Sequence, residues 1–289
     1  MDAADSTAKI AAALEVKHTR MTEILRELQS VAVAFSAGVD STLVLKVALD
    51  TLGAKNVLAV TGRSDSVAAA ELAEAGRIVL DLDVEHVVLD TDEFDNPNYV
   101  ANPDNRCYFC KTSLYGNMAR LLSDRGIKTI VNGTNVDDLG DYRPGLDAAR
   151  EHGVRSPLAE AGLTKADVRE LSRRLGLATH DKPAAPCLSS RVPYGEAVTP
   201  EKLRMIEAAE RFLHDELGIR ECRVRHHNGL ARIEVAPDNL PLLTKAGNAA
   251  RIDAHFRSLG YTIVTVDLRG FRSGSLNEAL PLTLLHTMG

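Results

Sequence analysis

The sequence has no apolar run that approaches membrane-spanning length, and its first residues lack the basic and apolar regions of a secretory signal. Its four cysteines are too few for a disulfide scaffold in a chain of 289 residues. The net charge of −6 does not favour a surface that coats nucleic acid. We therefore expect a cytoplasmic protein without a membrane or nucleic-acid partner, whose cysteines are thiols, metal ligands or reactive groups.

The most informative stretch begins with five apolar residues at 31–35 and continues with a short polar turn at 36–41. The unbroken apolar run predicts a strand buried on both faces, and the apolar residues at 43–48 recur at helical spacing. A helix that follows a tight turn presents unpaired backbone N–H groups and the positive end of its dipole. The sequence therefore predicts a site for phosphate, against the plainer interpretation of a capped strand–turn–helix.

The pattern Ser-x-Gly-x-Asp-Ser in this turn resembles the PP-loop of the ATP pyrophosphatases, and no Gly-Lys-Ser/Thr follows that would make it a Walker A loop. The resemblance implies cleavage of ATP between its α and β phosphates, with Mg²⁺ close to Asp40. The family usually has glycine where Ala37 stands, so a positive φ there would strain the alanine. The residues expected to bind the nucleotide are Ser36, Ala37, Gly38, Val39, Asp40 and Ser41.

Apolar strand patterns at 31–35, 56–61, 85–89 and 128–131 alternate with helical patterns. They predict an α/β fold with a doubly wound parallel sheet, in which ligands bind beyond the carboxyl ends of the strands. Candidate adenine or ribose contacts are therefore Thr61 and Ser64, and Gly133 and Thr134 are candidates for the same cleft. Turn chemistry is an equally weighted alternative for these four residues. The expected flanking helices include 7–28, 66–82 and 164–175, the last with Thr164 and Asp167 as its cap.

A proline-rich stretch at 181–195 rules out a helix or a central strand and predicts a loop at a domain junction. The pattern then restarts as a small α+β unit. We expect a PP-loop domain at 1–195 and a C-terminal α+β domain at 196–289 for substrate binding or oligomerisation. Its expected elements are a helix at 199–217, strands at 221–226, 231–235 and 261–267, and a helical region at 237–259.

Cys107 and Cys110 form a single C-x-x-C motif, which we expect a helix to follow. The motif alone fits a redox pair, half of a zinc site or part of an iron–sulfur site. Cys187 lies in the proline-rich loop, and three thiolates can hold a [4Fe–4S] cluster with one iron left for an extra sulfide. Zinc, with Cys187 and His180 as further ligands, is the weaker alternative. Cys222 is interpreted as a small core residue.

Taken together, the motifs resemble those of the LarE family, PP-loop sulfur transferases that help to build the nickel-pincer nucleotide cofactor of lactate racemase. The PP-loop is shared by many ligases and thiolases, whereas the loop around Cys187 combined with Arg223 and Arg225 is far more specific to this family. The likeness extends through most of the sequence, at 35–41, 105–111, 133–138, 141–145, 181–183, 187–195, 223–225, 230–234 and 272–277.

The resemblance implies a PP-loop ATP pyrophosphatase fold, which is adenine nucleotide alpha hydrolase-like. It also implies an enzyme that adenylates a carboxylate of a pyridinium dicarboxylate mononucleotide and lets sulfur displace AMP to leave a thiocarboxylate. In some members the cysteine that matches Cys187 gives up its sulfur and becomes dehydroalanine. Others hold a [4Fe–4S] cluster on three cysteines, and the presence of Cys107, Cys110 and Cys187 favours this type. The resemblance further implies a sulfide donor and a homo-oligomer, a dimer or a hexamer.

The arginines are expected to hold the phosphate or carboxylates of the substrate, because the planar guanidinium fork suits both groups. Without the resemblance, an Arg-x-Arg pattern in a strand would indicate a solvated face. Asp138 and Glu234 are magnesium candidates, with a cap or a solvated carboxylate as the alternative. The expected catalytic residues are Cys187, Asp40, Ser190 and Arg191, and the expected substrate arginines are Arg191, Arg223 and Arg225.

Other interpretations remain. A tRNA thiolase of the PP-loop type also uses three cysteines but usually carries a basic RNA module, which the acidic balance does not favour. An amide-forming synthetase would draw on ammonia, and no glutaminase-like segment is present. A protein that senses ATP without turning it over is the non-enzymatic alternative.

Overall fold

The computed structural model describes residues 3–140 and 143–272, so Asp141 and residues 273–277 of the quoted motifs lie outside the described part. The described chain divides into two compact units. The first comprises the residues up to Glu93 together with Asn105–Ala185, and the second comprises Phe94–Asp104 and the residues from Pro186 onward. These units depart from the expected boundary after Gly195, and the division into domains stays a prediction.

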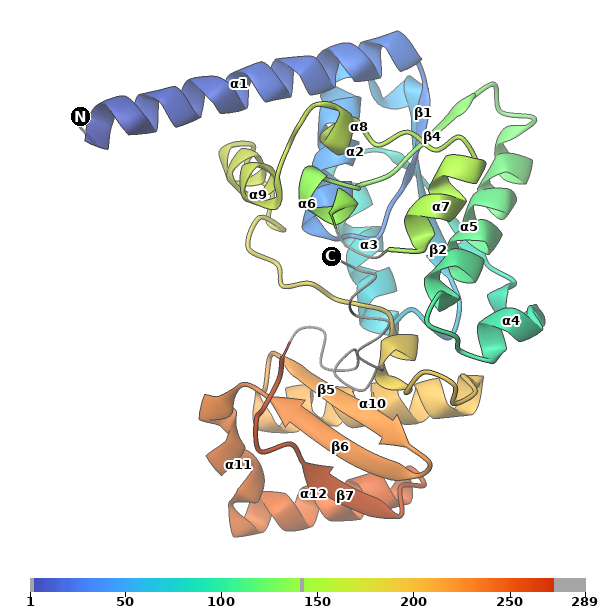
Figure 1. Ribbon diagram of the computed structural model, residues 1–289, viewed down its shortest axis with the longest axis vertical. Helices are drawn as coiled ribbons and strands as arrows, with labels where there is room; N and C mark the ends of the chain where they lie inside the picture. The colour runs from blue at the N-terminus through green and yellow to red at the C-terminus, as the bar shows by residue number, and fades with distance from the viewer. Residues whose placement is uncertain (1–2, 141–142, 273–289) are drawn as a thin grey trace. The chain divides into compact units, whose positions relative to one another are not determined.

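The first unit contains a four-stranded parallel sheet in the order β3-β2-β1-β4. Figure 1 labels β1, β2 and β4 of this sheet. The strands are β1 (Val31–Ala34), β2 (Val57–Arg63), β3 (Glu85–Asp90) and β4 (Thr129–Val131). The apolar residues of β1, β2 and β4 are largely buried, because helices cover both faces of the sheet, whereas β3 at its edge has no fully buried residue. The predicted α/β fold with a parallel sheet is confirmed.

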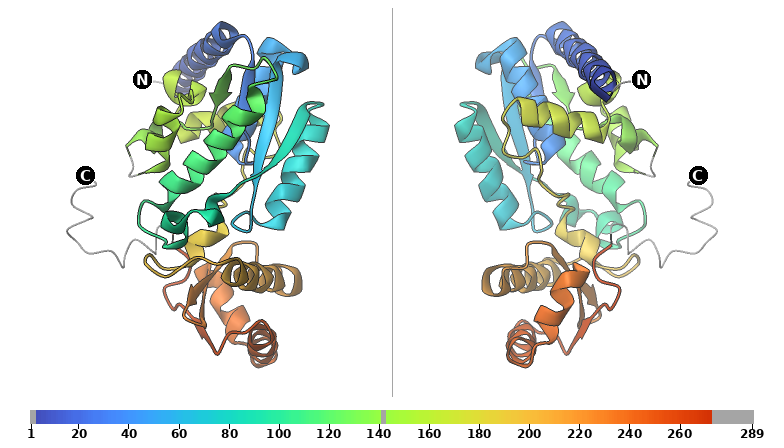
Figure 2. Two further views of the ribbon diagram at one scale, coloured as in Figure 1. Left: turned by 90° about the vertical axis from the view of Figure 1, so that its right-hand side faces the viewer. Right: turned by 90° about the vertical axis from the view of Figure 1, so that its left-hand side faces the viewer.

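Alternate residues of β1 face two separate apolar clusters. Val31 and Val33 pack with the helices of one face, whereas Ala32 packs with those of the other face. Figure 2 shows helices on both sides of the sheet. The first face is covered by α1 (Ala3–Leu28), α2 (Val39–Leu52), α3 (Ala69–Asp81), α8 (Pro157–Glu160) and α9 (Lys165–Arg174), and the second by α5 (Arg106–Leu122) and α7 (Gly145–Glu151).

The first unit also contains the short elements η1 (Ala54–Asn56) and α6 (Val136–Leu139). The short helix η2 spans Glu93–Asp95, and α4 (Pro97–Val100) belongs to the second unit. The expected cap of α9 is confirmed, because the Thr164 hydroxyl accepts from the backbone N–H of Asp167 and the Asp167 carboxylate accepts from that of Thr164. Such a reciprocal pair satisfies N–H groups that have no partner inside the helix.

Two expected helix starts are wrong. The helix predicted from Ser66 begins only at Ala69, because the Ser64 hydroxyl accepts from the backbone N–H of Ser66 and holds a turn there. The helix expected after the C-x-x-C motif instead begins at Arg106 and includes both cysteines in its first turns.

The second unit is a small α+β assembly with a three-stranded sheet in the order β5-β6-β7, as expected. Strand β5 is antiparallel to β6, and β7 is parallel to β6. The turn between β5 and β6 has positive φ at both Asn228 (44°) and Gly229 (85°), the conformation that two-residue hairpins favour. The elements are η3 (Leu188–Arg191), α10 (Pro200–Leu217), β5 (Cys222–His227), β6 (Leu230–Val235), η4 (Pro237–Asn239), α11 (Leu240–Thr244), α12 (Ala246–Ser258) and β7 (Ile263–Val266).

Tyr99 and Asn102 join the segment 94–104 to the second unit. The Tyr99 hydroxyl lies 2.8 Å from that of Ser189, and the Asn102 amide donates to three backbone carbonyls, those of Val192, Pro193 and Glu196. Among the described residues, none of the helices combines the length and apolar character required to cross a bilayer.

Candidate functional site

The predicted strand–loop–helix at the phosphate site is present. Strand β1 ends at Ala34, and α2 begins at Val39 with Gly38 as its N-cap. The hydroxyl oxygens of Ser36 and Ser41 lie 3.2 Å apart, and the Ser41 hydroxyl also donates to the carbonyl of Gly38. The first backbone N–H groups of a helix have no partner inside it, so this turn offers donors and two hydroxyls to an anion.

Ala37 has a φ of +56° and is fully buried. A left-handed backbone costs an L-residue about 1–2 kcal/mol, so the departure from glycine carries the strain expected from the sequence. Lys182 lies beside this residue. Its ammonium donates to the Ala37 carbonyl at 3.2 Å and contacts the carboxylates of Glu71 at 2.8 Å and Glu74 at 2.6 Å.

Gly133, which follows β4, lies directly against the phosphate loop. A Cβ at this position would lie 2.8 Å from the backbone nitrogen of Ser41 and 3.0 Å from the Cβ of Asp40. Only glycine permits so close an approach of two backbones. The structure therefore brings Gly133 to the loop at 36–41, as the topology predicted, and the backbone N–H of the next residue, Thr134, donates to the Asn132 side chain at 3.1 Å.

Asp40 projects from the first turn of α2 and has two side-chain partners from other segments. The amide of Asn135, which is 1% exposed, donates to one carboxylate oxygen at 3.1 Å, and the ammonium of Lys165 pairs with the other. Lys165 is the first residue of α9. Lys165 was not identified from the sequence. Its position directly after the capping residue Thr164 places it at a helix N-terminus, and this was the signal that could have identified it.

Two other candidates have internal partners. Asp138 caps α6 by accepting from the backbone N–H of Asn135 at 3.0 Å and pairs with Arg143 at 2.6 Å. Thr61 lies inside β2, which continues to Arg63, and its hydroxyl donates to the Phe35 carbonyl at 2.9 Å. The expected place of Thr61 in a turn after the strand is therefore wrong, while Ser64 does follow the strand.

The cysteines of the first unit, Cys107 and Cys110, stand one helical turn apart near the start of α5, an arrangement that places both thiols on one face. Cys107 is exposed and Cys110 partly buried. Cys187 belongs to the second unit, where it precedes η3. Within the described part of either unit, no three His, Cys, Asp or Glu side chains come together as a group that could hold a metal ion.

Cys222 is buried in the core of the second unit, as the sequence predicted. Burial raises the pKa of its thiol to about 12, and the nearby Glu210 carboxylate acts in the same direction. A thiol with such a pKa is protonated near neutral pH and is a poor nucleophile.

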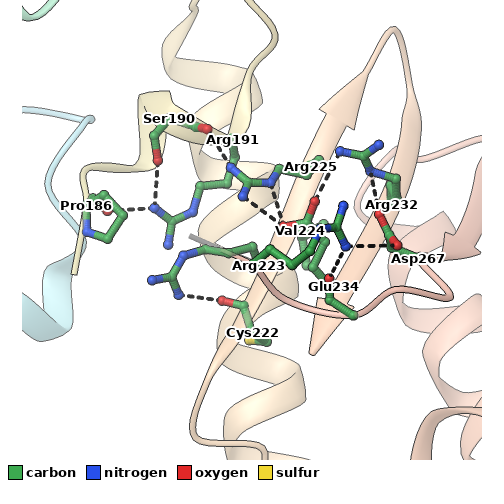
Figure 3. A network of polar contacts seen from close by, with 12 residues as sticks. Pro186, Ser190, Arg191, Cys222, Arg223, Val224, Arg225, Arg232, Glu234 and Asp267 are labelled. Atoms are coloured by element: carbon green, nitrogen blue, oxygen red, sulfur yellow. Dashed lines mark hydrogen bonds and ion pairs between the residues drawn. The ribbon is translucent and has the colours of Figure 1, made fainter. Parts of the chain in front are cut away.

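The predicted substrate arginines form a buried polar network in the second unit (Figure 3). Arg191 donates twice to Glu210, both times at 2.9 Å, and also to the carbonyls of Pro186 and Cys187. Burial alone would lower the pKa of Arg191, but the paired Glu210 carboxylate reverses this and raises it. Arg191 thereby fixes the backbone on which Cys187 and Ser190 stand.

Arg225 extends the network to the β6 strand. It donates to Glu234 at 2.8 and 3.0 Å and to the Ser190 carbonyl at 2.8 Å, and Glu234 is fully buried and also contacts Arg232. The solvated-face interpretation of the Arg-x-Arg pattern is wrong, because Arg223 and Arg225 are 8% and 5% exposed. Arg223 lies over the Phe271 ring at 4.9 Å, and its pKa is lowered by burial and by the neighbouring Arg191.

Comparison with known proteins places this arrangement in context. No protein-family model matches the chain. It is 45% identical to an uncharacterized protein of Synechocystis sp. over 267 residues, which is 92% of this chain and 99% of the relative. It is 30% identical to an uncharacterized protein of Methanocaldococcus jannaschii over 174 residues, 60% of this chain and 67% of that protein.

A third relative carries a functional name. The chain is 37% identical over 276 residues to the pyridinium-3,5-bisthiocarboxylic acid mononucleotide synthase of Lactiplantibacillus plantarum, and the match covers 96% of this chain and 99% of the synthase. With that identity over nearly the full length of both proteins, the chain belongs to the LarE family, the family of this synthase.

Proposed function

We propose that this protein is an ATP-dependent sulfur transferase of cofactor biosynthesis. It adenylates a carboxylate of a pyridinium dicarboxylate mononucleotide, releases pyrophosphate, and converts the acyl adenylate to a thiocarboxylate with release of AMP. The observation that carries the proposal is the contact of Gly133 with Asp40 and Ser41, joined to near full-length similarity to a named synthase. The contact leaves no room for a side chain at position 133.

ATP is proposed to bind with its β and γ phosphates at residues 36–41. The backbone N–H groups at the start of α2 and the hydroxyls of Ser36 and Ser41 would serve as donors, and Asp40 would be the protein ligand of Mg²⁺. The residues fit these groups, since magnesium in nucleotide sites typically takes one or two carboxylates and completes its shell with phosphates and water. Thr61 and Ser64 remain proposed contacts of the adenine or ribose, and Gly133 and Thr134 are proposed to line the same cleft.

Adenylation matters because a carboxylate is a poor electrophile and AMP is a good leaving group. Thiolate or sulfide can attack the acyl adenylate near neutral pH without a strong base. The new C–S bond forms as the C–O bond to AMP breaks. Arg223 and Arg225 are proposed to hold the anionic groups of the substrate. Arg191 and Ser190 are proposed to position the loop of Cys187, because Arg191 donates to the Cys187 carbonyl and to the Ser190 hydroxyl, the latter contact visible in Figure 3.

Cys107, Cys110 and Cys187 are the proposed thiolate ligands of a [4Fe–4S] cluster, with zinc as the weaker alternative. Three thiols fit such a cluster in kind and number, and two of them stand one helical turn apart. When bound, the cluster would supply an iron that has no protein ligand and can carry an extra sulfide. In the alternative route, the Cys187 thiolate attacks the acyl adenylate, and loss of its α-proton with cleavage of the Cβ–S bond leaves dehydroalanine.

The sulfur route is tested by anaerobic purification of the wild type and the Cys187→Ala variant. The cluster route predicts iron, acid-labile sulfide and a visible iron–sulfur spectrum in the wild type, and loss of all three in Cys187→Ala. Zinc in both proteins would overturn the cluster assignment. Absence of iron together with a mass decrease of one H₂S at Cys187 after turnover would establish the sacrificial route.

The adenylation step has its own assay. Pyrophosphate release should require both Mg²⁺ and the dicarboxylate mononucleotide, because the phosphates are proposed to leave only when the carboxylate attacks. ATP binding without pyrophosphate release in the presence of that substrate would support a nucleotide sensor instead. Stimulation by tRNA rather than by the mononucleotide would favour a tRNA thiolase.

A further inference from the structure

Lys165 and Asp40 form an ion pair between the N-terminus of α9 and the first turn of α2. Their side chains are 38% and 21% exposed, so neither group is sealed in the core. Exposed ion pairs are held weakly and exchange partners readily. This pair occupies the carboxylate through which the proposed function would bring a metal to the phosphates.

The backbone around this lysine is fixed, while its side chain is a flexible stem. The backbone N–H of Lys165 donates to the Asp137 carboxylate at 2.7 Å, and Thr164 and Asp167 cap the helix in front of and behind it. A lysine on a fixed helix end can move its ammonium between nearby anions through its four-carbon stem without disturbing the fold.

The carboxylate of Asp40 is also oriented. The buried amide of Asn135 donates to Oδ1 at 3.1 Å, which leaves Oδ2 to the Lys165 ammonium. The other lysine at the loop, Lys182, is directed at the Ala37 carbonyl and at Glu71 and Glu74. Lys165 is therefore the cation that the described structure places on Asp40 itself.

We propose that Lys165 is a positioning residue that takes the place of magnesium on Asp40 in the nucleotide-free protein and moves to the phosphates when the metal–ATP complex binds. This inference rests on the proposed function. A metal ion and an ammonium group compete for the same carboxylate oxygen. Without either cation, the negative charge of the Asp40 carboxylate would repel the phosphate chain of ATP. The displaced ammonium would then neutralise charge on the departing pyrophosphate.

The competition predicts a specific change in the coupling between metal and nucleotide. In Lys165→Met, metal-free ATP meets an unpaired Asp40 carboxylate, whereas metal-bound ATP meets one that the metal neutralises. The variant should bind ATP more weakly than the wild type both with and without metal, and the loss of affinity should be larger without metal. Reciprocity of linked binding then requires magnesium to bind more favourably in the variant complex.

The experiment measures the Kd of an ATP analogue with a methylene group between its α and β phosphorus atoms, in saturating Mg²⁺ and in excess EDTA. The ratio of the EDTA value to the Mg²⁺ value should rise by about ten-fold in Lys165→Met, because one unscreened charge remains beside the phosphates. Lys165→Arg should restore the wild-type ratio. Equal loss of affinity in both conditions would show a merely structural role and overturn the assignment.

Lys17 provides a matched control. Its ammonium, from α1, pairs at 2.6 Å with Asp167, which lies in α9 as Lys165 does, and the two side chains are 32% and 21% exposed. Lys17→Met should leave the ratio unchanged. If Lys165→Met does not fold, Lys165→Gln, which also removes the charge of Lys165, takes its place: the ratio should again rise, and an unchanged ratio would overturn the inference.

The assay separates this inference from the function on which it rests. A wild type that binds the analogue, with an unaltered ratio in Lys165→Met, keeps the proposed function and loses only the role of Lys165. A folded wild type that fails to bind the analogue in either condition overturns both.

Discussion

Gly133 lies so close to Ser41 that a Cβ at position 133 would be only 2.8 Å from the backbone nitrogen of Ser41. This close approach joins the loop that follows β4 to the first turn of α2 and forms one wall of the proposed phosphate site. Gly133→Ala should weaken binding of the ATP analogue by more than about ten-fold, since the loop must shift by several tenths of an ångström to admit the methyl group. Titration of the analogue in Mg²⁺ measures this.

Gly76 in α3 is the control for that substitution, because a Cβ there would meet no atom within 4 Å. Gly76→Ala should leave binding unchanged and stabilise the protein by up to about 1 kcal/mol, the helix-propensity difference between the two residues. Normal binding in Gly133→Ala would contradict the proposed position of the phosphates.

Ala37→Gly should raise the stability of the protein. The backbone φ of +56° strains alanine but not glycine, and the expected gain is about 1 kcal/mol, reduced by the greater freedom of glycine in the unfolded chain. Chemical denaturation measures the change, and Ala37→Val should have the opposite sign. A loss of stability in Ala37→Gly would mean that the Ala37 methyl contributes more to core packing than its backbone costs.

Lys182→Met should destabilise the first unit by about 1–3 kcal/mol, because it removes a donor from the Ala37 carbonyl and leaves Glu71 and Glu74 without their shared cation. Replacement of both glutamates by glutamine in the same variant should recover part of the loss. If the triple variant is no more stable than Lys182→Met, repulsion between the two carboxylates is not part of the cost. Denaturant titration distinguishes the two results.

Glu210→Gln should impair sulfur transfer more than adenylation. The variant leaves Arg191 buried without its bidentate carboxylate, at a cost of about 3–5 kcal/mol, and loosens the loop that carries Cys187. The phosphate site belongs to the first unit and should retain binding of the ATP analogue. Glu216→Gln, which removes an exposed partner of Arg251, is the control and should change stability by less than about 1 kcal/mol.

The raised pKa of Cys222 predicts that the stability of the protein falls at alkaline pH. Its pKa is raised by burial from 9.0 to about 12, so its thiol is neutral in both states below about pH 9. Above that pH the unfolded state loses the proton first, and the folded state therefore loses stability as the pH rises towards 12. Cys222→Ala should show a smaller loss between those pH values than the wild type, as measured by denaturation at each pH. Iron content should not change, since a protonated core thiol is not expected to ligate a cluster.

Several features depend only on short stretches of chain and could be predicted from the amino-acid sequence. The apolar run at 31–35 specified a strand buried on both faces, the Thr164–Asp167 cap specified the start of α9, and the PP-loop pattern located the turn between β1 and α2. The strain of Ala37 was likewise predictable, since a turn that favours glycine imposes its φ on any residue placed there.

Contacts between residues that are far apart in the sequence depend on how the whole chain packs. Lys165 and Asp40 are separated by 125 positions, and their pairing depends on how α9 packs beside α2, which no local pattern encodes. The burial of Arg191 and Arg225 likewise depends on carboxylates that α10 and β6 supply, Glu210 and Glu234. A charged residue looks the same in the sequence whether it will be exposed to water or buried against an oppositely charged partner. Which of the two occurs depends on the fold of the whole unit.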